Sequence, residues 1–484
     1  MTNDTLKTFL EATACVEKEY MNEPLEITQG AIPPELTGTL FRNGNGRFVH
    51  QGVKYDHFFD GDGMITRFVL SGGQLRYSNR YVRTKEFVHE QQEGRMLYRS
   101  FGTNIPGGWT RNALKMQFKN AANTSVVWHA GHLLALWEGG WPHRIDPHTL
   151  ETIDRYSYNG TLRNDFSWLD QQIMEEMPFS AHPKEHPDTG ILHNFGTVAG
   201  TKQRLVMYEV HPDGSARIAR AIPMDELAFT HDFILTEKNH RVFFLPPVTF
   251  NIWKAFLGLA TPVESIKAKS DQKTKILVVG DEGLETYETD FYFIFHYANG
   301  YEADEHTLVI DAFAMDDFPG AEANVALMAG DDSATPQGKL RRFTIDRRSG
   351  RVASRLLTDH PGELPAIDPG LNGKKYRYVW AVGAPVDAPY KLLDGIIKID
   401  VDDQQTLHAD LHPDLPGEPL FIPHPERRAE DHGWVAYIKF QVATRETYLE
   451  LRDAADLTLV AKARLPHNIP PGFHGCWVDQ VFGV

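Results

Sequence analysis

Short apolar runs, broken by Gly, Asn, Asp and Pro, follow one another along almost the whole chain. Within these runs, apolar and polar residues alternate, and β-branched and aromatic residues are common, which favours strands over helices. Examples are SVVWHAGHLLALWEGG (125–140), FYFIFHYANGYE (291–302) and HTLVIDAFAM (306–315). Long helical patterns are scarce after the first two dozen residues. We therefore expect a chain that builds its core almost entirely from sheets.

A weak repeat of the form strand, polar turn, strand recurs through the sequence. It is visible in HRIDPHTLETIDRYS (143–157), YEVHPDGSARIARA (208–221), RFTIDRRSGRVASRL (342–356), IKIDVDDQQTLHADL (397–411) and LELRDAADLTLVAKARL (449–465). Such hairpins are typical of the outer strands of propeller blades, and a pair of β-sandwiches is the alternative. A propeller would also let residues far apart in sequence meet on one axis, because successive blades point their inner strands at the centre.

Composition excludes several classes of protein. The 484 residues are 42% hydrophobic and 24% charged, and the net charge of −16 is unlike that of a nucleic-acid-binding protein. Two cysteines, Cys15 and Cys476, are too few for a secreted disulfide framework, so we expect a cytoplasmic protein. Residues 1–24 predict a short amphipathic helical segment, and no apolar run is long enough to span a bilayer.

The segment TFNIWKAFLGLATPVE (249–264) departs from the strand pattern. Its apolar residues predict either a helix packed on the core or an exposed patch that touches a membrane or guides a lipophilic substrate. The sequence leaves both interpretations open, with peripheral membrane contact as the consequence of the second.

Four of the 22 histidines stand in distinctive short settings. They are His182 in A-H-P-K, His231 in T-H-D-F, His296 in F-H-Y-A-N-G-Y-E and His474 in F-H-G-C-W. Neutral imidazole is the commonest protein ligand for a transition metal, and four of them together would make an all-nitrogen site. Asp60 and Asp62 in F-D-G-D-G-M are interpreted as structural residues of a tight turn.

From about residue 24 to its end, the chain resembles the carotenoid cleavage oxygenases. The resemblance lies in a series of motifs in the expected order: GAIPPELTGTLFRNGNG (30–46), FDGDGM (59–64), ANT (122–124), LLALWEGG (133–140), AHP (181–183), HDF (231–233), FHYANGYE (295–302), ELP (363–365), YRYVW (376–380), GEPLFIP (417–423), EDHGW (430–434) and FHGCW (473–477). Two further segments, MLYRSFGTNIPGGW (96–109) and WEGGWPHR (137–144), look most like the bacterial apocarotenoid oxygenases.

The resemblance implies an all-β fold, a seven-bladed β-propeller with a helical and loop cap over its top face. Residues 25–484 would form one catalytic domain after the helical segment 1–24. One Fe(II) per chain would be bound by the four histidines His182, His231, His296 and His474. Three glutamates would stand behind the ligands, with Glu138 paired to His231, Glu363 to His296 and Glu418 to His474, and His182 would have no such partner. Carboxylates in these places fix the imidazole tautomer and offset the charge of the metal.

The same resemblance implies the reaction, in which O2 is the co-substrate and a carbon–carbon double bond of a lipophilic substrate is split into two carbonyl products. Thr124 of the ANT motif would place its methyl near one open metal position, and Phe59 would line the substrate cavity. No nucleotide-binding motif suggests a second cofactor. In stilbene-cleaving relatives a Lys commonly precedes the first glutamate; here Trp137 stands there and favours an apocarotenoid that yields a retinal-like aldehyde. A stilbene- or phenylpropene-cleaving dioxygenase, a retinoid isomerohydrolase and a non-catalytic carotenoid-binding propeller are the alternatives.

Overall fold

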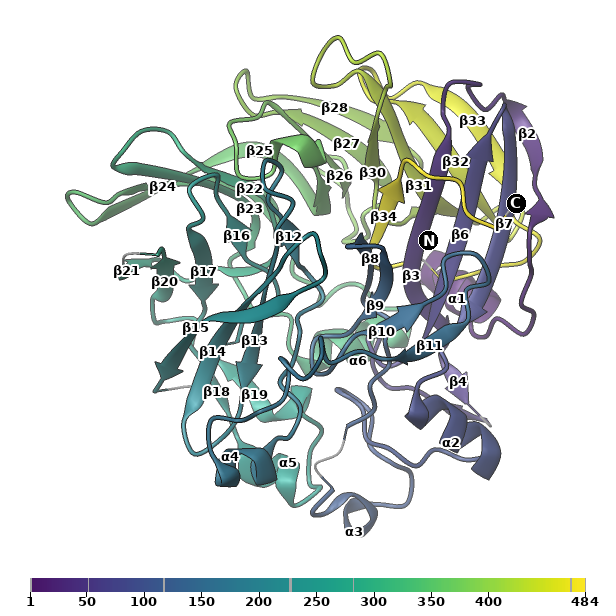
Figure 1. Ribbon diagram of the computed structural model, residues 1–484. Coiled ribbons are helices and arrows are strands. Elements are labelled where there is room, and N and C mark those ends of the chain that lie inside the picture. The colour runs from purple at the N-terminus through teal and green to yellow at the C-terminus, as the bar shows by residue number, and fades with distance from the viewer. Residues whose placement is uncertain are drawn as a thin grey trace.

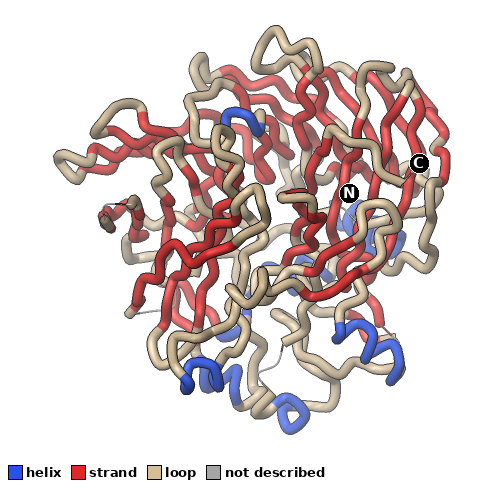
Figure 2. The backbone as a smooth tube through the Cα atoms, in the orientation of Figure 1, coloured by secondary structure: helices blue, strands red, loops and turns tan. Residues whose placement is uncertain are grey.

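Strands dominate the computed structural model, which describes residues 2–50, 52–115, 118–225, 229–281, 283–470 and 472–483 (Figure 1). The prediction of a mostly β protein is confirmed. Helices are few and short among the described residues (Figure 2). They are α1 (Thr2–Ala12), α2 (Lys85–Glu93), α3 (Trp109–Asn112), α4 (Trp168–Ile173), α5 (Ile252–Phe256), α6 (Ala321–Met328), and the 3-10 turns η1 (Val263–Ser265) and η2 (Pro369–Leu371).

One sheet joins the two ends of the chain. Its strand order is β1 (Glu23–Pro24), β7 (Gln74–Tyr81), β6 (Asp62–Ser71), β3 (Gly38–Arg47) and β34 (Gly475–Val478). Strands β3 and β34 are antiparallel, with Thr39 opposite Val478 and Arg42 opposite Gly475. The last described strand is thus hydrogen-bonded to one of the first.

Three four-stranded sheets follow in chain order. The first is β8 (Ser125–His129), β9 (His132–Leu136), β10 (His143–Ile145) and β11 (Thr152–Arg155). The second is β12 (Lys184–Glu185), β13 (Leu192–Val198), β14 (Gln203–Val210) and β15 (Ala216–Met224). The third is β16 (Ile234–Leu235), β17 (Arg241–Leu245), β20 (Thr274–Val279) and β21 (Leu284–Thr289).

The remaining large sheets have seven and six strands. The seven-stranded sheet is β22 (Phe293–Glu302), β23 (Thr307–Met315), β24 (Lys339–Asp346), β25 (Arg351–Ala366), β26 (Tyr378–Gly383), β27 (Gly395–Asp400) and β28 (Gln405–Asp410). The six-stranded sheet is β2 (Glu26–Gly30), β33 (Leu459–Arg464), β32 (Glu446–Asp453), β31 (Gly433–Gln441) and β29 (Leu415–Pro416), with β30 (Leu420–Pro423) also on β31. Two-stranded ribbons are formed by β4 (Val49–His50) with β5 (Val53–Lys54), and by β18 (Val248–Phe250) with β19 (Ile266–Ala268).

The long strand β25 serves two neighbouring groups of strands. Its first part, 351–356, pairs with β24, whereas Gly362 and Glu363 pair with β26. The seven-stranded sheet therefore bends at β25 into a group β22–β25 and a group β25–β28.

Apolar cores lie between consecutive groups of strands. Within the described residues, seven clusters of buried apolar side chains each bridge two neighbours around the molecule, including one between the first sheet and the sheet of β31–β33. The five hairpins expected from the repeat are present as β10–β11, β14–β15, β24–β25, β27–β28 and β32–β33. Burial between sheets, rather than within one layer, is what makes the short strands stable.

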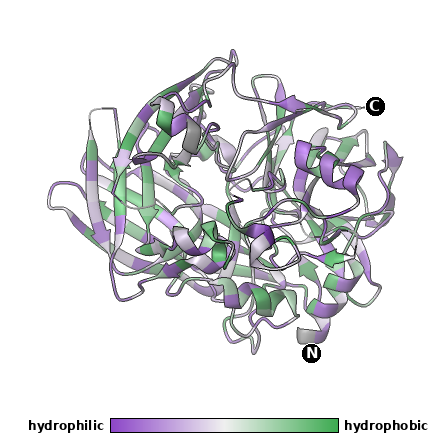
Figure 3. Ribbon diagram, turned by 90° about the horizontal axis from the view of Figure 1, so that it is seen from below, coloured by the Kyte–Doolittle hydropathy of each residue, from purple (hydrophilic) through white to green (hydrophobic). Residues whose placement is uncertain are grey.

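Helices α2, α3, α4 and α5 gather at one end of the molecule (Figure 1). Figure 3 views the molecule from this end, with helices in front of the strands. The segment 249–264 lies here and is not a long helix packed on the core: only 252–256 are α-helical, and Trp253 is 69% exposed. No described helix combines the length and apolar character that crossing a lipid bilayer requires.

Candidate metal centre

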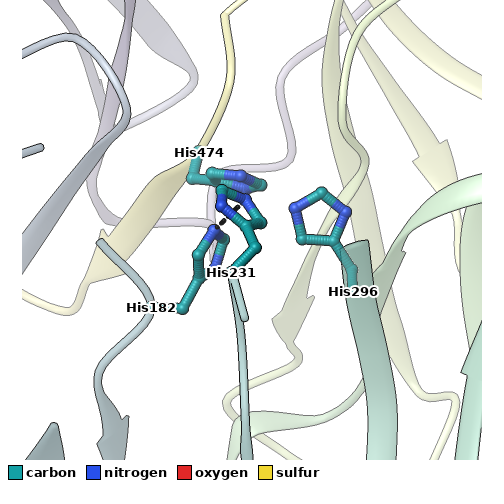
Figure 4. A group of neighbouring side chains, drawn as sticks. All are labelled: His182, His231, His296 and His474. Carbon is teal, nitrogen blue, oxygen red and sulfur yellow. Dashed lines mark hydrogen bonds between the residues drawn. The ribbon is translucent and has the colours of Figure 1, made fainter. Parts of the chain in front are cut away.

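Four histidines from distant parts of the chain point toward a common centre (Figure 4). The nearest ligand atoms of His182, His231, His296 and His474 all lie within 4.8 Å of one another. The Nε2 atoms of His182 and His231 are 2.9 Å apart. The ring of His182 lies 4.3 Å from that of His474 and 5.0 Å from that of His296, centre to centre.

Each histidine lies in, or shortly before, a strand at the edge of its sheet. His182, His231 and His474 precede the edge strands β12, β16 and β34, and His296 lies in the edge strand β22. Edge strands of different sheets that face one point can each deliver one side chain to it. This placement explains how residues as far apart as 182 and 474 form one site.

Three of the four imidazoles contact a carboxylate through Nδ1. The Nδ1 atom of His296 lies 2.6 Å from Glu363, that of His474 lies 2.7 Å from Glu418, and that of His231 lies 3.3 Å from Glu138. These are the pairs that the sequence predicts. Because a neutral imidazole donates its proton from one nitrogen only, donation from Nδ1 to the carboxylate leaves Nε2 free to bind a metal.

The three glutamates differ in their other contacts. Glu418 also accepts a hydrogen bond at 2.5 Å from Arg42, and Glu138 accepts one at 3.3 Å from the backbone N–H of Ala181. Burial raises the pKa of Glu138 to about 8. Burial acts the same way on Glu418, but the Arg42 charge and the contact with His474 outweigh it, so the pKa of Glu418 is lowered. A divalent cation at the centre would favour the ionised form of both.

The electrostatics of the histidines suit metal binding. Burial, with a smaller contribution from neighbouring histidines, holds the pKa of His182 and His231 well below the ordinary value, and burial also lowers that of His474. Burial acts the same way on His296, but the Glu363 carboxylate more than offsets it and the pKa of His296 is raised. Neutral imidazole is the form that binds metals.

Two geometric observations show that the residues fit a metal ion. The Nε2 atom of His296 is buried and has no hydrogen-bond partner in the part of the chain that the structure describes. The 2.9 Å between the Nε2 atoms of His182 and His231 also fits adjacent ligands: two ligands at a right angle, each about 2.1 Å from one metal, are about 3 Å apart. A set of four nitrogen donors without thiolates suits iron, cobalt, nickel, copper or zinc.

The chain is similar to known proteins along most of its length. The model of the family described as retinal pigment epithelial membrane protein matches residues 13–479. The chain is 32% identical over 479 residues to the apocarotenoid-15,15'-oxygenase of Synechocystis, covering 95% of each chain. The chain belongs to the carotenoid oxygenase family. It is 28% identical to resveratrol cleavage oxygenase 1 of Aspergillus fumigatus, covering 93% of this chain and 91% of that one.

Solved structures place the fold in the same family. The crystal structure of cobalt-substituted Synechocystis ACO superposes with a TM-score of 0.89 at 30% identity, covering 98% of this chain and 99% of that one. Members of this carotenoid oxygenase family carry names of oxidative cleavage enzymes. The present chain is therefore an oxygenase by family.

Thr124 and Phe59 lie close to the segments that carry His296 and His474. The carbonyl of Thr124 accepts a hydrogen bond from the backbone N–H of His474 at 3.2 Å, and its hydroxyl donates to Asn123. The ring of Phe59 contacts edge-on the rings of Phe295 and Phe473, which directly precede His296 and His474 in sequence. Both residues therefore lie near the four histidines, and their roles there stay predictions.

Trp137 lies next to Glu138, and its ring folds over the backbone of Gly139. A Cβ atom built on Gly139 would stand 2.7 Å from the indole, and one on Gly140 would stand 3.4 Å from it. These glycines leave the room that the indole occupies. None of the described aromatic contacts joins Trp137 to Phe59.

Sequence reasoning missed Phe295, Phe473 and Arg42 as members of the site. The two phenylalanines had a local signal, since each flanks a metal-site histidine. Arg42 had none, because its partner Glu418 is 376 residues away.

Asp60 and Asp62 have structural contacts, as expected. Asp62 is buried against Arg47 and Lys119, at 2.5 and 2.6 Å, and Asp60 accepts the hydroxyl of Thr103 at 2.6 Å.

Proposed function

We propose that this chain is an Fe(II)-dependent dioxygenase that splits one carbon–carbon double bond of an apocarotenoid into two carbonyl products. The observation that carries the proposal is the group of four converging imidazoles, three of them backed by glutamates. No carboxylate takes part in the ligand group among the described residues, so two positions of a six-coordinate ion would stay free of protein. The proposed occupancy is one iron per chain, with O2 as co-substrate.

The side chains of the site would have different roles in the proposed reaction. Iron, when bound, supplies the redox-active ion that reaction with O2 requires. His182, His231, His296 and His474 would hold it, and Glu138, Glu363 and Glu418 would orient three of these ligands and offset the positive charge. Thr124 would narrow access to one open position. Phe59, with Phe295 and Phe473, would give the substrate an apolar wall and exclude water.

We further propose that residues 25–484 form a single seven-bladed propeller with one iron on its axis. Support comes from the seven apolar clusters between neighbouring groups of strands and from the bend of the seven-stranded sheet at β25. The hydrogen bonds between β3 and β34 would close the ring. Helices α2, α3, α4 and α5 and their loops would form the cap over one face.

An apocarotenoid is the proposed substrate for two reasons. The relative from Synechocystis, similar over 95% of its length, is named for an apocarotenoid, and Trp137 offers a large apolar face next to the first glutamate. A retinal-like aldehyde would be one product. The name of the Aspergillus fumigatus relative supports a stilbene as the second candidate. Trp137 argues against it, because an indole brings no cation to a phenolic oxygen.

We also propose that the capped end touches a membrane through an apolar patch formed by Trp109, Leu114, Trp253, Leu257 and Leu259. These side chains are 57%, 67%, 69%, 41% and 61% exposed, respectively. The backbone N–H of Leu114 donates to the carbonyl of Phe256, which joins the two segments of the patch. Lys254 and Lys267, together with Glu264, line a surface hollow of about 470 Å³ beside Trp253, and the two lysines would favour anionic lipids.

Product identification tests the proposed function. Purified, iron-loaded protein under O2 is given β-apocarotenals, carotenes, resveratrol and isoeugenol, and products are identified by mass spectrometry. We expect aldehydes from the β-apocarotenals, with oxygen from labelled O2 in an aldehyde product. Cleavage of resveratrol or isoeugenol alone would overturn the substrate and leave the oxygenase. Protein that carries no iron after loading would support a non-catalytic carotenoid-binding role instead.

A further inference from the structure

His182 differs from the other three histidines of the cluster. Among the residues that the structure describes, no carboxylate lies at ion-pair distance from its ring, whereas the other three each have a glutamate. Yet its Nε2 atom lies 2.9 Å from that of His231, the closest approach of two ligand atoms recorded in the cluster. Something other than a carboxylate at the ring must therefore hold the His182 segment in place.

Asp232 connects the segments that carry three of the histidines. One carboxylate oxygen lies 2.9 Å from the ammonium group of Lys184, two residues after His182. The other accepts a hydrogen bond at 3.2 Å from the backbone N–H of Tyr297, the residue after His296. Asp232 itself directly follows His231. One side chain thus touches the neighbours of His182 and His296 and is itself a neighbour of His231.

The environment of Asp232 makes this connection rigid. Asp232 is 1% exposed. Its Oδ1 atom, which lies near Lys184, also accepts a hydrogen bond at 2.8 Å from the backbone N–H of Phe233. A buried carboxylate without partners costs several kcal/mol, so movement of either segment away from Asp232 is strongly opposed. Because Lys184, Tyr297 and Phe233 occupy both oxygens, Asp232 has little capacity left to serve as a metal ligand.

We propose that Asp232 and Lys184 form a positioning pair that sets the separation of His182, His231 and His296. The pair would take the place of the glutamate that His182 lacks and would act through the backbone rather than through the imidazole ring. This inference rests on the metal centre of the proposed function. It adds two residues to the determinants of metal geometry, neither of which binds the metal.

The contacts distinguish positioning from general support of the fold. Lys398 and Asp431 form another ion pair, at 2.5 Å, in which the lysine side chain is 6% exposed against 21% for Lys184. Its other contacts in the described structure are with Ala455, Tyr378 and Trp380, outside the cluster. Loss of the Lys398 pair should lower stability without altering ligand geometry, so Lys398→Met is the matched control.

The experiment uses Co²⁺ alone as the probe, since its visible absorption reports coordination geometry. Asp232→Asn and Lys184→Met should bind Co²⁺ roughly 10- to 100-fold more weakly than the wild type, with a changed visible spectrum. Lys184→Arg, which keeps the charge, should recover affinity and spectrum at least in part. Lys398→Met should bind Co²⁺ as the wild type does, at a similar loss of thermal stability.

Wild-type Co²⁺ affinity and spectrum in both Asp232→Asn and Lys184→Met would overturn the positioning role. Because the test needs no substrate, its outcome is separate from that of the cleavage assay. If the wild type cleaves β-apocarotenals and both variants bind Co²⁺ normally, the inference alone fails. If the variants lose Co²⁺ and the wild type cleaves none of the substrates, the proposed function alone fails.

Discussion

The carboxylate of Glu363 lies 2.6 Å from Nδ1 of His296, the shortest of the three glutamate–histidine contacts around the metal centre. The same carboxylate accepts a hydrogen bond from the backbone N–H of Leu364 at 2.5 Å. The backbone of Leu364 therefore holds the Glu363 carboxylate in place, and the carboxylate in turn fixes the tautomer and orientation of His296.

Glu363→Gln should weaken metal retention roughly 10- to 100-fold, the usual cost of losing such a partner. A glutamine can still accept from Nδ1, but it no longer offsets the charge of the metal. Iron content after gel filtration measures the effect. Glu302→Gln is the matched control, because Glu302 lies 2.7 Å from Nδ1 of His240 outside the cluster. Equal iron content in Glu363→Gln and wild type would contradict the pairing.

Metal loading should stabilise the folded protein. Glu138, Glu363 and Glu418 each contact one histidine of the cluster, and within the described residues Glu418 is the one of the three that pairs with an arginine. Binding to the folded state alone adds about 2.7 kcal/mol when free metal is 100 times its dissociation constant. Thermal unfolding of the chelator-treated and reloaded protein checks this. An unchanged melting temperature at saturating Fe(II) or Co(II) would argue against a resident ion at this place.

Much of the centre could be predicted from sequence because its ligands carry local signals. Each of the four histidines stands in its own short motif beside Phe, Gly or Pro, and the resemblance to a family supplied the pairing with glutamates. The five outer hairpins were visible because a strand, a polar turn and a second strand are contiguous in the chain.

The remaining features depend on contacts between distant residues. Arg42 on β3 reaches Glu418 because the first sheet packs on the sheet of β30–β33, and Asp232 reaches Lys184 because two edge strands lie close together. The length of α5 was not predictable either. The apolar residues of 249–264 suit a buried helix and an exposed patch equally well, and tertiary packing decides between them.

Gly139→Ala should disturb substrate selection through Trp137. The added methyl would stand 2.7 Å from the indole, so the ring has to move while the backbone of Gly139, whose φ is not positive, tolerates alanine. If Trp137 lines the cavity, a shift of this size should lower the kcat/KM for β-apocarotenals roughly 10- to 100-fold. Gly283→Ala, where an added Cβ meets nothing within 4 Å, is the control. Unchanged kcat/KM and product ratios would remove Trp137 from the substrate site.

Replacing Trp253 and Leu259 by serine should reduce binding to lipid vesicles by about tenfold or more, given about 1.5–3 kcal/mol per apolar side chain transferred. The two side chains are 69% and 61% exposed, so the folded protein should lose little stability. Sedimentation with anionic vesicles measures binding. Leu407→Ser changes another exposed side chain, 46% accessible, on β28 at the other end of the molecule (Figure 1). If the variant with both serines binds vesicles as well as Leu407→Ser does, the segment 249–264 has a structural role only.

Asp60 should make the stability of the protein fall as pH rises. Burial raises the pKa of this carboxyl from 3.8 to about 7, against hydrogen bonds from Thr103 and Gly102 that favour the anion. Below about pH 4, Asp60 is protonated in both the folded and the unfolded state and contributes no pH dependence. Between these two pKa values, the unfolded chain releases the proton while the folded protein keeps it, so the unfolded state gains relative stability with each step in pH. The cost levels off above the folded pKa, at about 4 kcal/mol as an upper figure.

Asp60→Asn removes this titration. Whatever its own effect on packing, the free energy of unfolding of Asp60→Asn minus that of the wild type should rise from pH 5 to pH 8. All other groups titrate in both proteins and cancel in the difference. Chemical denaturation at the two pH values measures it, with the same metal content in each sample. A difference that stays constant between the two pH values would show that Asp60 is ionised in the folded protein and that its hydrogen bonds outweigh burial.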